Sequence, residues 1–311
     1  MKIVFLGTPE FAVPSLKMLA LTKNIGISTV VTQPDKAVGR KQTLTAPPIK
    51  ATALELGLPV IQPKNKQSLI ESLKDLKADF FVVIAFGMLL PKEILKMPKY
   101  GCINVHASLL PKYRGASPIQ ESLLNGDKET GISIIKIDEE LDHGDVFFIK
   151  RIPIEKEDNL ISLSNRLAET SSIVLPLVLH DIIKQNLSPL AQLHRNATFC
   201  RKIRKEDGKI DWENKTAEEI NNMLKAYTPW PLIYTDFNGK KIQILETTIS
   251  NDKIAPGKFI LDNNILKIGT KKGSLIPKTV QLEGKKPMDI KSFINGYRQF
   301  LKGFCNLIKK K

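Results

Sequence analysis

Residues 2–10 of the chain, KIVFLGTPE, decide its class of fold. Ile3 to Leu6 form a short apolar run, which predicts a buried strand. A Gly-Thr-Pro turn follows and leads into residues 10–21, where the spacing of apolar residues predicts a helix. A strand, a tight turn and a helix open a Rossmann-like α/β sheet, and that turn lies at the edge where such sheets bind ligands.

The same alternation continues to residue 106. Apolar runs predict strands at residues 27–32, 80–85 and 102–106, and helical patterns lie between them at residues 48–56 and 68–76. Nearly continuous apolar strands separated by helices indicate a mostly parallel sheet that is covered on both faces.

Longer strands of alternating polarity follow at residues 131–137 and 146–154. We expect them to extend the sheet as antiparallel additions and to lead into a helix over residues 159–185. The prediction for residues 1–187 is therefore a Rossmann-like catalytic domain.

A second pattern begins after a predicted linker at residues 188–205. Residues 206–311 contain short strands separated by Asn-Gly, Asn-Asp and Lys-Gly turns, which predicts a small, OB-like β-barrel domain. The expected strands are residues 233–237, 241–248, 257–260, 265–268 and 274–282, with helices at residues 216–226 and 289–300.

Composition limits the possible functions. The chain has 311 residues, of which 42% are hydrophobic and 25% charged, as expected for two globular domains. Its longest apolar stretch, residues 80–91, is too short to span a bilayer, so no membrane contact is expected. The first residues lack the pattern of a signal or transit peptide, and three widely spaced cysteines predict neither disulfides nor a zinc site. We therefore expect a cytoplasmic protein.

The net charge of +15 is concentrated in the C-terminal part. Residues 201–311 hold 23 Lys and Arg against 12 Asp and Glu, a net charge of +11. Such asymmetry is typical of a domain that meets a polyanion, although a lysine-rich solvated surface gives the same count.

Three side chains carry the candidate chemistry. Asn104 and His106 are two residues apart at the end of a predicted strand, so both point to one face. Asp142 follows in the segment ELDHGD. An amide can stabilise an oxyanion, an imidazole can move a proton, and a carboxylate can orient the imidazole, which together suit acyl transfer.

Two alternative sites are less well supported. The turn after the first strand has one glycine, whereas a dinucleotide site needs three. His143 beside Asp142 suggests a metal ligand, but the four histidines show no metal-binding spacing, so no metal is expected.

Taken together, the motifs resemble those of the methionyl-tRNA formyltransferases, a family that uses 10-formyltetrahydrofolate. The resemblance covers nearly the whole chain. It rests on GTPEFA (7–12), TQPD (32–35), AFGMLLP (85–91), NVHASLLPKYRG (104–115), ASPIQ (116–120), LDHGD (141–145), KED (205–207), IDW (210–212), PWP (229–231) and EGKKPM (283–288).

The resemblance implies an enzyme of translation initiation, monomeric and in the bacterial cytoplasm. It would move the formyl group of 10-formyltetrahydrofolate to the α-amino group of methionine on initiator tRNA. Asn104, His106 and Asp142 would be the catalytic residues. The residues implied for folate binding are Phe86, Gly87, Met88, Leu89, Ser108, Leu109, Leu110 and Pro111, and those for tRNA binding are Arg40, Lys41, Lys202 and Lys205.

The chain departs from the family pattern at three places. The loop after Arg40 is less basic than is usual, Glu140 stands where Gly is frequent, and His143 stands where Thr is frequent. None of these removes a catalytic group. A formyltransferase acting on a sugar nucleotide or on glycinamide ribonucleotide is the nearest alternative, and a non-catalytic RNA-binding protein on the same scaffold is the second. The basic C-terminal domain argues against the first, and the intact catalytic set argues against the second.

Overall fold

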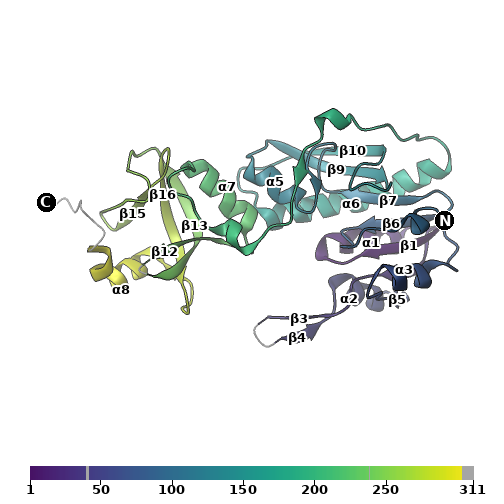
Figure 1. Ribbon diagram of the computed structural model, residues 1–311, viewed down its shortest axis with the longest axis horizontal. Coiled ribbons are helices and arrows are strands. Elements are labelled where there is room, and N and C mark those ends of the chain that lie inside the picture. Colours follow the sequence, from purple (N-terminus) through teal and green to yellow (C-terminus); the bar gives the residue numbers. More distant parts are fainter. Residues whose placement is uncertain (40–41, 238, 303–311) are drawn as a thin grey trace. The chain divides into compact units, whose positions relative to one another are not determined.

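The computed structural model describes residues 1–39, 42–237 and 239–302. They form two compact units, each with a sheet of its own (Figure 1). Of the described residues, the first unit comprises those within 1–118, 129–154 and 163–201, and the second comprises those within 119–128, 155–162 and 202–302. Within the described ranges, no helix is both long enough and apolar enough to cross a membrane.

The sheet of the first unit has the strand order β10-β9-β7-β6-β1-β2-β5 (Figure 1). Neighbouring strands are parallel from β7 to β5, whereas β9 and β10 are antiparallel to their neighbours. This arrangement confirms the predicted mostly parallel sheet and its two antiparallel additions. The strands are β1 (Lys2–Gly7), β2 (Gly26–Val31), β5 (Val60–Ile61), β6 (Phe80–Ile84), β7 (Cys102–His106), β9 (Glu129–Lys136) and β10 (Val146–Pro153).

Helices connect these strands close to the predicted positions. The predicted helix at residues 10–21 is a 3-10 turn, η1, followed by α1, which begins with Pro14 in its first turn. Helix α3 begins earlier than predicted because the Asn65 side chain accepts a hydrogen bond from the Ser68 N–H, at 2.9 Å, and caps the helix. The helices are η1 (Glu10–Ala12), α1 (Val13–Leu21), α2 (Pro48–Glu55), α3 (Lys66–Leu73), α4 (Lys92–Leu95) and α6 (Leu160–Ile183), with η2 at His194–Asn196.

Both faces of the central strands are buried. Val4 and Phe5, adjacent in β1 and therefore on opposite faces, are both fully inaccessible to solvent. Val4 belongs to an apolar cluster with Leu69 of α3 and Ile94 of α4. Burial on both faces explains why these strands are apolar without alternation.

The order of strands fixes where a ligand is expected. From β1 the sheet extends through β2 on one side and β6 on the other, so the connections diverge beyond the carboxyl ends of β1 and β6. There the Thr8 hydroxyl donates a hydrogen bond to the carbonyl of Phe86, at 2.9 Å. Strand β7, which ends at His106, is the next strand beyond β6.

Several short elements were not predicted from the sequence. Lys36–Val38 (β3) and Thr43–Thr45 (β4) pair as an antiparallel hairpin after β2, and its strand residues are exposed. Arg114–Gly115 (β8) and Phe199–Cys200 (β11) form a parallel pair between distant segments. Because neither pair has an apolar face of its own, periodicity does not reveal it.

The second unit has an antiparallel sheet in the order β12-β13-β16-β15-β14, with β17 paired to β16. This sheet agrees with the small barrel predicted from the sequence. Its core includes Ile242, Val280 and Leu282 of the strands and Phe293 of α8. The elements are η3 (Lys205–Gly208), α7 (Ala217–Tyr227), β12 (Ile233–Phe237), β13 (Lys240–Ser250), β14 (Phe259–Asp262), β15 (Ile265–Gly269), β16 (Ser274–Leu282), β17 (Met288–Asp289) and α8 (Ile290–Lys302), with α5 at Pro118–Leu124.

Helix α7, predicted at residues 216–226, begins with a capping box. The Thr216 hydroxyl accepts a hydrogen bond from the Glu219 N–H, at 3.2 Å, and the Glu219 carboxylate accepts one from the Thr216 N–H, at 2.7 Å. The backbone hydrogen bond lowers the pKa of the Glu219 carboxyl, and the hydroxyl of Thr216 lowers it further.

Candidate active site

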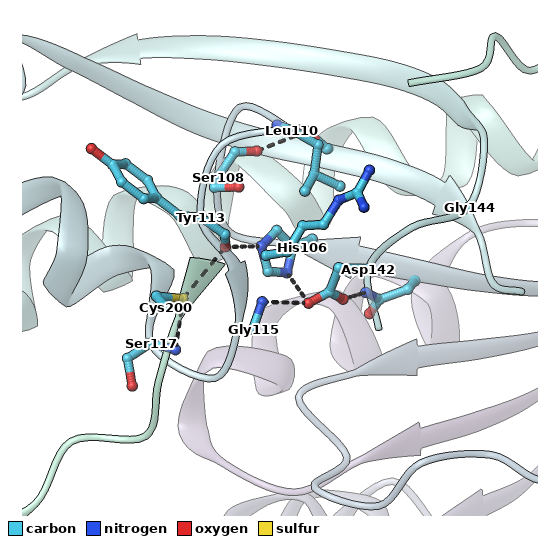
Figure 2. Close-up of polar contacts among 12 residues, drawn as sticks. His106, Ser108, Leu110, Tyr113, Gly115, Ser117, Asp142, Gly144 and Cys200 are labelled. Atoms are coloured by element: carbon cyan, nitrogen blue, oxygen red, sulfur yellow. Dashed lines mark hydrogen bonds and ion pairs between the residues drawn. The ribbon is translucent and has the colours of Figure 1, made fainter. Parts of the chain in front are cut away.

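The three candidate catalytic side chains meet in the first unit, and Figure 2 shows His106 and Asp142 facing each other. The amide of Asn104 lies 3.3 Å from one carboxylate oxygen of Asp142, and Nδ1 of His106 lies 3.5 Å from the other. Only 6% of the His106 side chain and 10% of the Asp142 side chain are exposed. Strand β7 supplies the first two residues, and the loop between β9 and β10 supplies Asp142.

The imidazole of His106 is held from both sides. Its Nε2 lies 2.9 Å from the backbone carbonyl of Tyr113, and its Nδ1 faces Asp142 (Figure 2). A carbonyl oxygen only accepts hydrogen bonds, so Nε2 carries a hydrogen in this arrangement. In a neutral ring Nδ1 is therefore the nitrogen that is free to take up a proton.

Asp142 is held by the loop that follows β7. The backbone N–H of Gly115 donates to Oδ2 of Asp142, at 2.8 Å (Figure 2). Gly115 has φ of +121°, and a Cβ atom there would lie 2.1 Å from the carbonyl oxygen of Cys200. Only glycine fits this position, and its fit places the N–H on the carboxylate.

The loop 108–111, implied by the resemblance to bind folate, begins directly after this cluster. The Ser133 hydroxyl of β9 donates to the carbonyl of Ser108, at 2.7 Å, and accepts from the N–H of Leu110, at 3.1 Å. The Ser108 hydroxyl donates to the carbonyl of Lys112, at 2.6 Å, and Pro111 follows Leu110 through a cis peptide bond. One buried serine of β9 thus fixes the backbone of this loop.

The second loop with predicted folate contacts, residues 86–89, follows β6, the parallel neighbour of β7. Phe86 is buried, Gly87 has φ of +84°, Met88 packs against the core beneath, and Leu89 is 58% exposed. The two loops therefore leave the sheet at adjacent carboxyl ends. Gly87 and Leu89 are exposed, so this loop reaches the surface, where its backbone groups can offer hydrogen bonds to a ligand.

The loop after β2 contains a polar group that the sequence did not identify as functional. The side-chain nitrogen of Gln33 is buried, and no described residue offers it a hydrogen-bond acceptor. Its Cγ would lie 4.0 Å from a Cβ on Gly87, which places it beside the loop 86–89. An unsatisfied buried amide is unfavourable, so this donor is available to a ligand.

Of the four predicted tRNA contacts, Arg40 and Lys41 lie outside the described residues. In the sequence they come between Val38, the last residue of β3, and Thr43, the first residue of β4. Lys202 and Lys205 are exposed in the second unit, just before and at the start of η3.

A third cation of the second unit accompanies Lys205. The ammonium group of Lys241 lies 3.5 Å from the ring centroid of Tyr234. Partial burial and the nearby charge of Lys205 lower the pKa of Lys241. The carboxylates of Glu283, Asp236 and Glu206 oppose this shift.

The histidine that suggested a metal site has a different set of partners. Nδ1 of His143 lies 2.6 Å from the Asp138 carboxylate, and its ring stacks on that of His194 with centroids 4.1 Å apart. Across the described ranges, no group of three or more His, Cys, Asp and Glu side chains is arranged to hold a metal.

A Rossmann-like sheet with an amide, an imidazole and a carboxylate at its ligand edge defines a class of acyl-transferring α/β enzymes. Comparison with known families narrows the class. Residues 1–179 match the family described as formyl transferase, and residues 202–298 match the formyl transferase C-terminal domain. The chain belongs to the formyl transferase family.

Two relatives at more than 40% identity are methionyl-tRNA formyltransferases. The chain is 44% identical to the methionyl-tRNA formyltransferase of Thermodesulfovibrio yellowstonii over 296 residues, which covers 94% of this chain and 95% of that protein. It is 43% identical to the methionyl-tRNA formyltransferase of Listeria monocytogenes serotype 4a, which covers 95% of each chain.

Solved structures share the fold at lower identity. WlaRD, a sugar 3N-formyl transferase solved with dTDP and 5-N-formyl-THF, has a TM-score of 0.66 and 21% identity, covering 92% of this chain and 99% of that chain. HypX from Aquifex aeolicus, in complex with tetrahydrofolic acid, has a TM-score of 0.61 and 17% identity, covering 97% of this chain and 48% of that chain.

Proposed function

We propose that this chain transfers the formyl group of 10-formyltetrahydrofolate to the α-amino group of methionine on initiator methionyl-tRNA. The meeting of Asn104, His106 and Asp142 at the ligand edge supports acyl transfer. The nearly full-length likeness to methionyl-tRNA formyltransferases, which includes the C-terminal domain, supports this acceptor. The proposal includes a folate co-substrate and no metal ion.

The reaction requires one proton to leave the amine and one to reach the folate. The amine nitrogen attacks the formyl carbon, and the carbonyl oxygen becomes an oxyanion in a tetrahedral intermediate. When the C–N10 bond breaks, N10 takes up a proton and the methionine amine has lost one. We assign the oxyanion to hydrogen bonds from the Asn104 amide and from protonated His106, since stabilising this charge is the largest catalytic contribution in acyl transfer.

We assign the movable proton to Nδ1 of His106. The Tyr113 carbonyl occupies Nε2, so a proton gained or lost by the ring is exchanged at Nδ1, the nitrogen that faces Asp142. The carboxylate stabilises the imidazolium when the proton is present and keeps the ring oriented when it is absent. Asp142 also accepts hydrogen bonds from Asn104 and Gly115, which hold it in place.

We propose that folate lies against the two adjacent loops, contacting Phe86, Gly87, Met88 and Leu89 in one and the loop 108–111 in the other. Exposed backbone after Phe86 suits recognition of a flat heterocycle rich in donors and acceptors. The unpartnered amide of Gln33 offers a further donor to a substrate oxygen beside Gly87.

We propose that the tRNA contacts Arg40 and Lys41 in the first unit and Lys202, Lys205 and Lys241 in the second. Neutralising several phosphates with lysine and arginine makes binding fall steeply as salt rises. The same proposal assigns residues 1–187 to catalysis, 188–205 to a linker and 206–311 to tRNA binding. It also includes a monomeric state and a place in the bacterial cytoplasm.

The test is formyl transfer from 10-formyltetrahydrofolate to methionyl initiator tRNA. Uncharged tRNA, elongator methionyl-tRNA and a UDP-linked amino sugar serve as parallel acceptors. Product with the charged initiator alone is the expected result. Transfer to the amino sugar instead would be consistent with the proposed catalytic residues and would refute initiator methionyl-tRNA as the acceptor.

A second arm separates catalysis from RNA binding. We expect His106→Ala to abolish transfer while tRNA affinity, measured by filter binding, stays within twofold of wild type. If wild-type protein binds tRNA and no acceptor receives a formyl group, the alternative of a non-catalytic RNA-binding protein stands.

A further inference from the structure

Residues 190–200, here called the strap, run along the loops that carry the catalytic residues. The N–H and carbonyl of Leu190 exchange hydrogen bonds with those of Val146, at 2.9 and 2.8 Å, next to the Asp142 loop. At its other end the strap pairs as β11 with Arg114–Gly115, the strand that follows His106. The strap thus contacts both loops of the active site within the first unit.

Gln192 lies in the middle of the strap and is 6% exposed. Its side-chain nitrogen donates to two backbone carbonyl oxygens of the catalytic loop, those of Asp142 at 2.9 Å and Gly144 at 2.7 Å. Both of these hydrogen bonds come from a neutral amide, which has two hydrogens on that nitrogen and therefore satisfies both acceptors.

The other end of the same amide is fixed by Arg114. The Gln192 oxygen accepts from Nε of Arg114 at 3.2 Å and from Nη2 at 2.7 Å, and Arg114 is only 4% exposed. Nη2 of Arg114 also lies 2.8 Å from Nδ1 of His194 in the strap. Arg114 only donates hydrogen bonds, so the Gln192 oxygen must face it. The carbonyls of Asp142 and Gly144 only accept, so the Gln192 nitrogen must face them, and the orientation of the amide is determined.

Asp142 needs such support because of its backbone. Its φ of +50° is in the left-handed region, which costs a residue with a Cβ about 1–2 kcal/mol and persists only where the surroundings hold it. Gly144, two residues later, has no room for a Cβ, which would lie 1.8 Å from the carbonyl oxygen of Lys136. The loop is therefore closely packed on one side and held by Gln192 on the other.

We infer that Gln192 is a positioning residue for the formyl-transfer reaction, and that Arg114 fixes Gln192 for this task. The Gln192 amide holds the backbone of Asp142, while the N–H of Gly115, adjacent to Arg114, holds its carboxylate. Together they set the distance between the carboxylate and Nδ1 of His106. This inference rests on the proposed function for its kinetic consequence.

Gln192→Glu tests it, because the carboxylate still accepts from Arg114 and no longer donates to Asp142 and Gly144. We expect kcat to fall by about ten- to a hundred-fold, the effect of displacing a catalytic group by about an ångström, with KM for both substrates within twofold. The charged pair with Arg114 offsets part of the cost of the two lost hydrogen bonds, so this fall in kcat is expected per folded molecule, beyond any change in the midpoint of urea unfolding. A purely structural role would lower the midpoint and kcat together.

Leu193→Ala is the matched control, since Leu193 is the next residue of the strap and is 61% exposed. It should leave kcat and the midpoint unchanged. If Gln192→Glu does not fold, Gln192→Met provides a similar volume without any of the four hydrogen bonds. The midpoint should then fall, because buried Arg114 loses its acceptor, and kcat per folded molecule should fall by the same ten- to a hundred-fold. A kcat within twofold of wild type in a folded variant overturns the inference, as does a loss of kcat that parallels the loss of stability.

An activity-independent readout separates this inference from the proposed function. Hydrogen exchange of the Gly115 amide, which donates to Asp142, should accelerate at least tenfold in the variant and not in the control. If exchange accelerates in the variant but the wild-type protein transfers no formyl group, the proposed function is refuted and the positioning role is retained. Unchanged exchange beside normal wild-type transfer would refute the positioning role alone.

Discussion

Two loops of the first unit are built in opposite ways. The loop bearing Asp142 is buried, and both the carboxylate and the backbone of that residue have hydrogen-bond partners. The β3–β4 hairpin after β2 extends from the sheet with exposed strands, among them Val38 at 55% and Leu44 at 70% exposure (Figure 1).

Within the described residues, side chains from elsewhere in the first unit hold the base of the hairpin. Nζ of Lys50 contacts both carboxylate oxygens of Asp35, at 2.9 and 2.8 Å, and the Gln62 amide donates to the same carboxylate at 2.7 Å. The difference suits two tasks. Groups that act on a developing charge must be placed before the reaction, whereas a segment that meets a large partner gains from remaining accessible.

The largest expected effect comes from the charge of the buried loop. Asp142→Asn keeps the shape and removes the charge that stabilises protonated His106. We expect kcat to fall by about a hundred- to ten-thousand-fold, the range for a lost acid–base partner, with little change in the KM for tRNA. Steady-state kinetics with methionyl initiator tRNA measures both.

Asp138→Asn is the control for that experiment, because Asp138 lies on the same loop and contacts His143 at the surface. Its kcat should stay within threefold of wild type. Equal losses in the two variants would mean that the charge of the loop as a whole, and not Asp142, matters for catalysis.

The second effect tests how tightly the buried loop is packed. In Gly115→Ala the new methyl group would meet the Cys200 carbonyl at 2.1 Å, at φ of +121°. We expect the free energy of unfolding to fall by about 2–5 kcal/mol, from backbone strain plus overpacking. Urea denaturation measures this loss.

Gly57→Ala isolates the backbone contribution, since Gly57 has φ of +68° with open space around it. It should cost about 1–2 kcal/mol. If both variants lose the same stability, the close approach of Cys200 does not constrain Gly115.

The third and smaller effect concerns the base of the hairpin. The hydrogen bond from Lys50, followed by that from Gln62, lowers the pKa of Asp35 below its ordinary value of 3.8. The stability that these hydrogen bonds contribute is complete at pH above 3.8, and it is lost as the pH falls through the lower pKa of Asp35 in the folded protein. Lys50→Met should therefore raise the pKa of Asp35, which carboxyl NMR titration measures, and raise the KM for tRNA by about two- to fivefold with kcat unchanged.

Lys17→Met, at an exposed position of α1, is the control for charge alone. It should leave the titration of Asp35 and the KM unchanged. A normal pKa shift with an unaffected KM would remove the hairpin from the account of tRNA binding.

The smallest expected effect is that the Cys102 thiol does not react with an alkylating reagent in the native protein. Burial raises the pKa of the Cys102 thiol to about 12, so at pH 8 only about one molecule in ten thousand carries the reactive thiolate. Iodoacetamide at pH 8 should therefore leave Cys102 unmodified in native protein and modify it in urea, as peptide mapping will show. Rapid native modification would mean that β7 opens, and the contrast with the hairpin would weaken.

Much of the fold follows from the sequence because apolar periodicity is a local property. The strands at residues 102–106 and 233–237 have the predicted bounds, and the predicted antiparallel pair became β9 and β10. The hairpin strands Lys36–Val38 and Thr43–Thr45 were missed, because exposed strands of three residues carry no apolar signal. The predicted boundaries at residues 187 and 205 stay predictions.

The site divides in the same way. That Asn104 and His106 lie near Asp142 was expected from their residue types and strand position, and the structure brings them together. Their catalytic roles remain proposals. Tyr113 acts through its backbone carbonyl, and Gln192 contacts Asp142 from 50 residues away, so no local pattern marks either of them.

The position of Gln192 in the chain has a consequence for synthesis. A ribosome makes the N-terminal residues first, at about 5–20 residues per second, so the 50 residues that separate Asp142 from Gln192 correspond to about 2.5–10 s. During that interval the nascent chain holds its three candidate catalytic side chains without the amide that contacts the Asp142 loop. The candidate active site is therefore completed by one of the last segments of its unit to be translated.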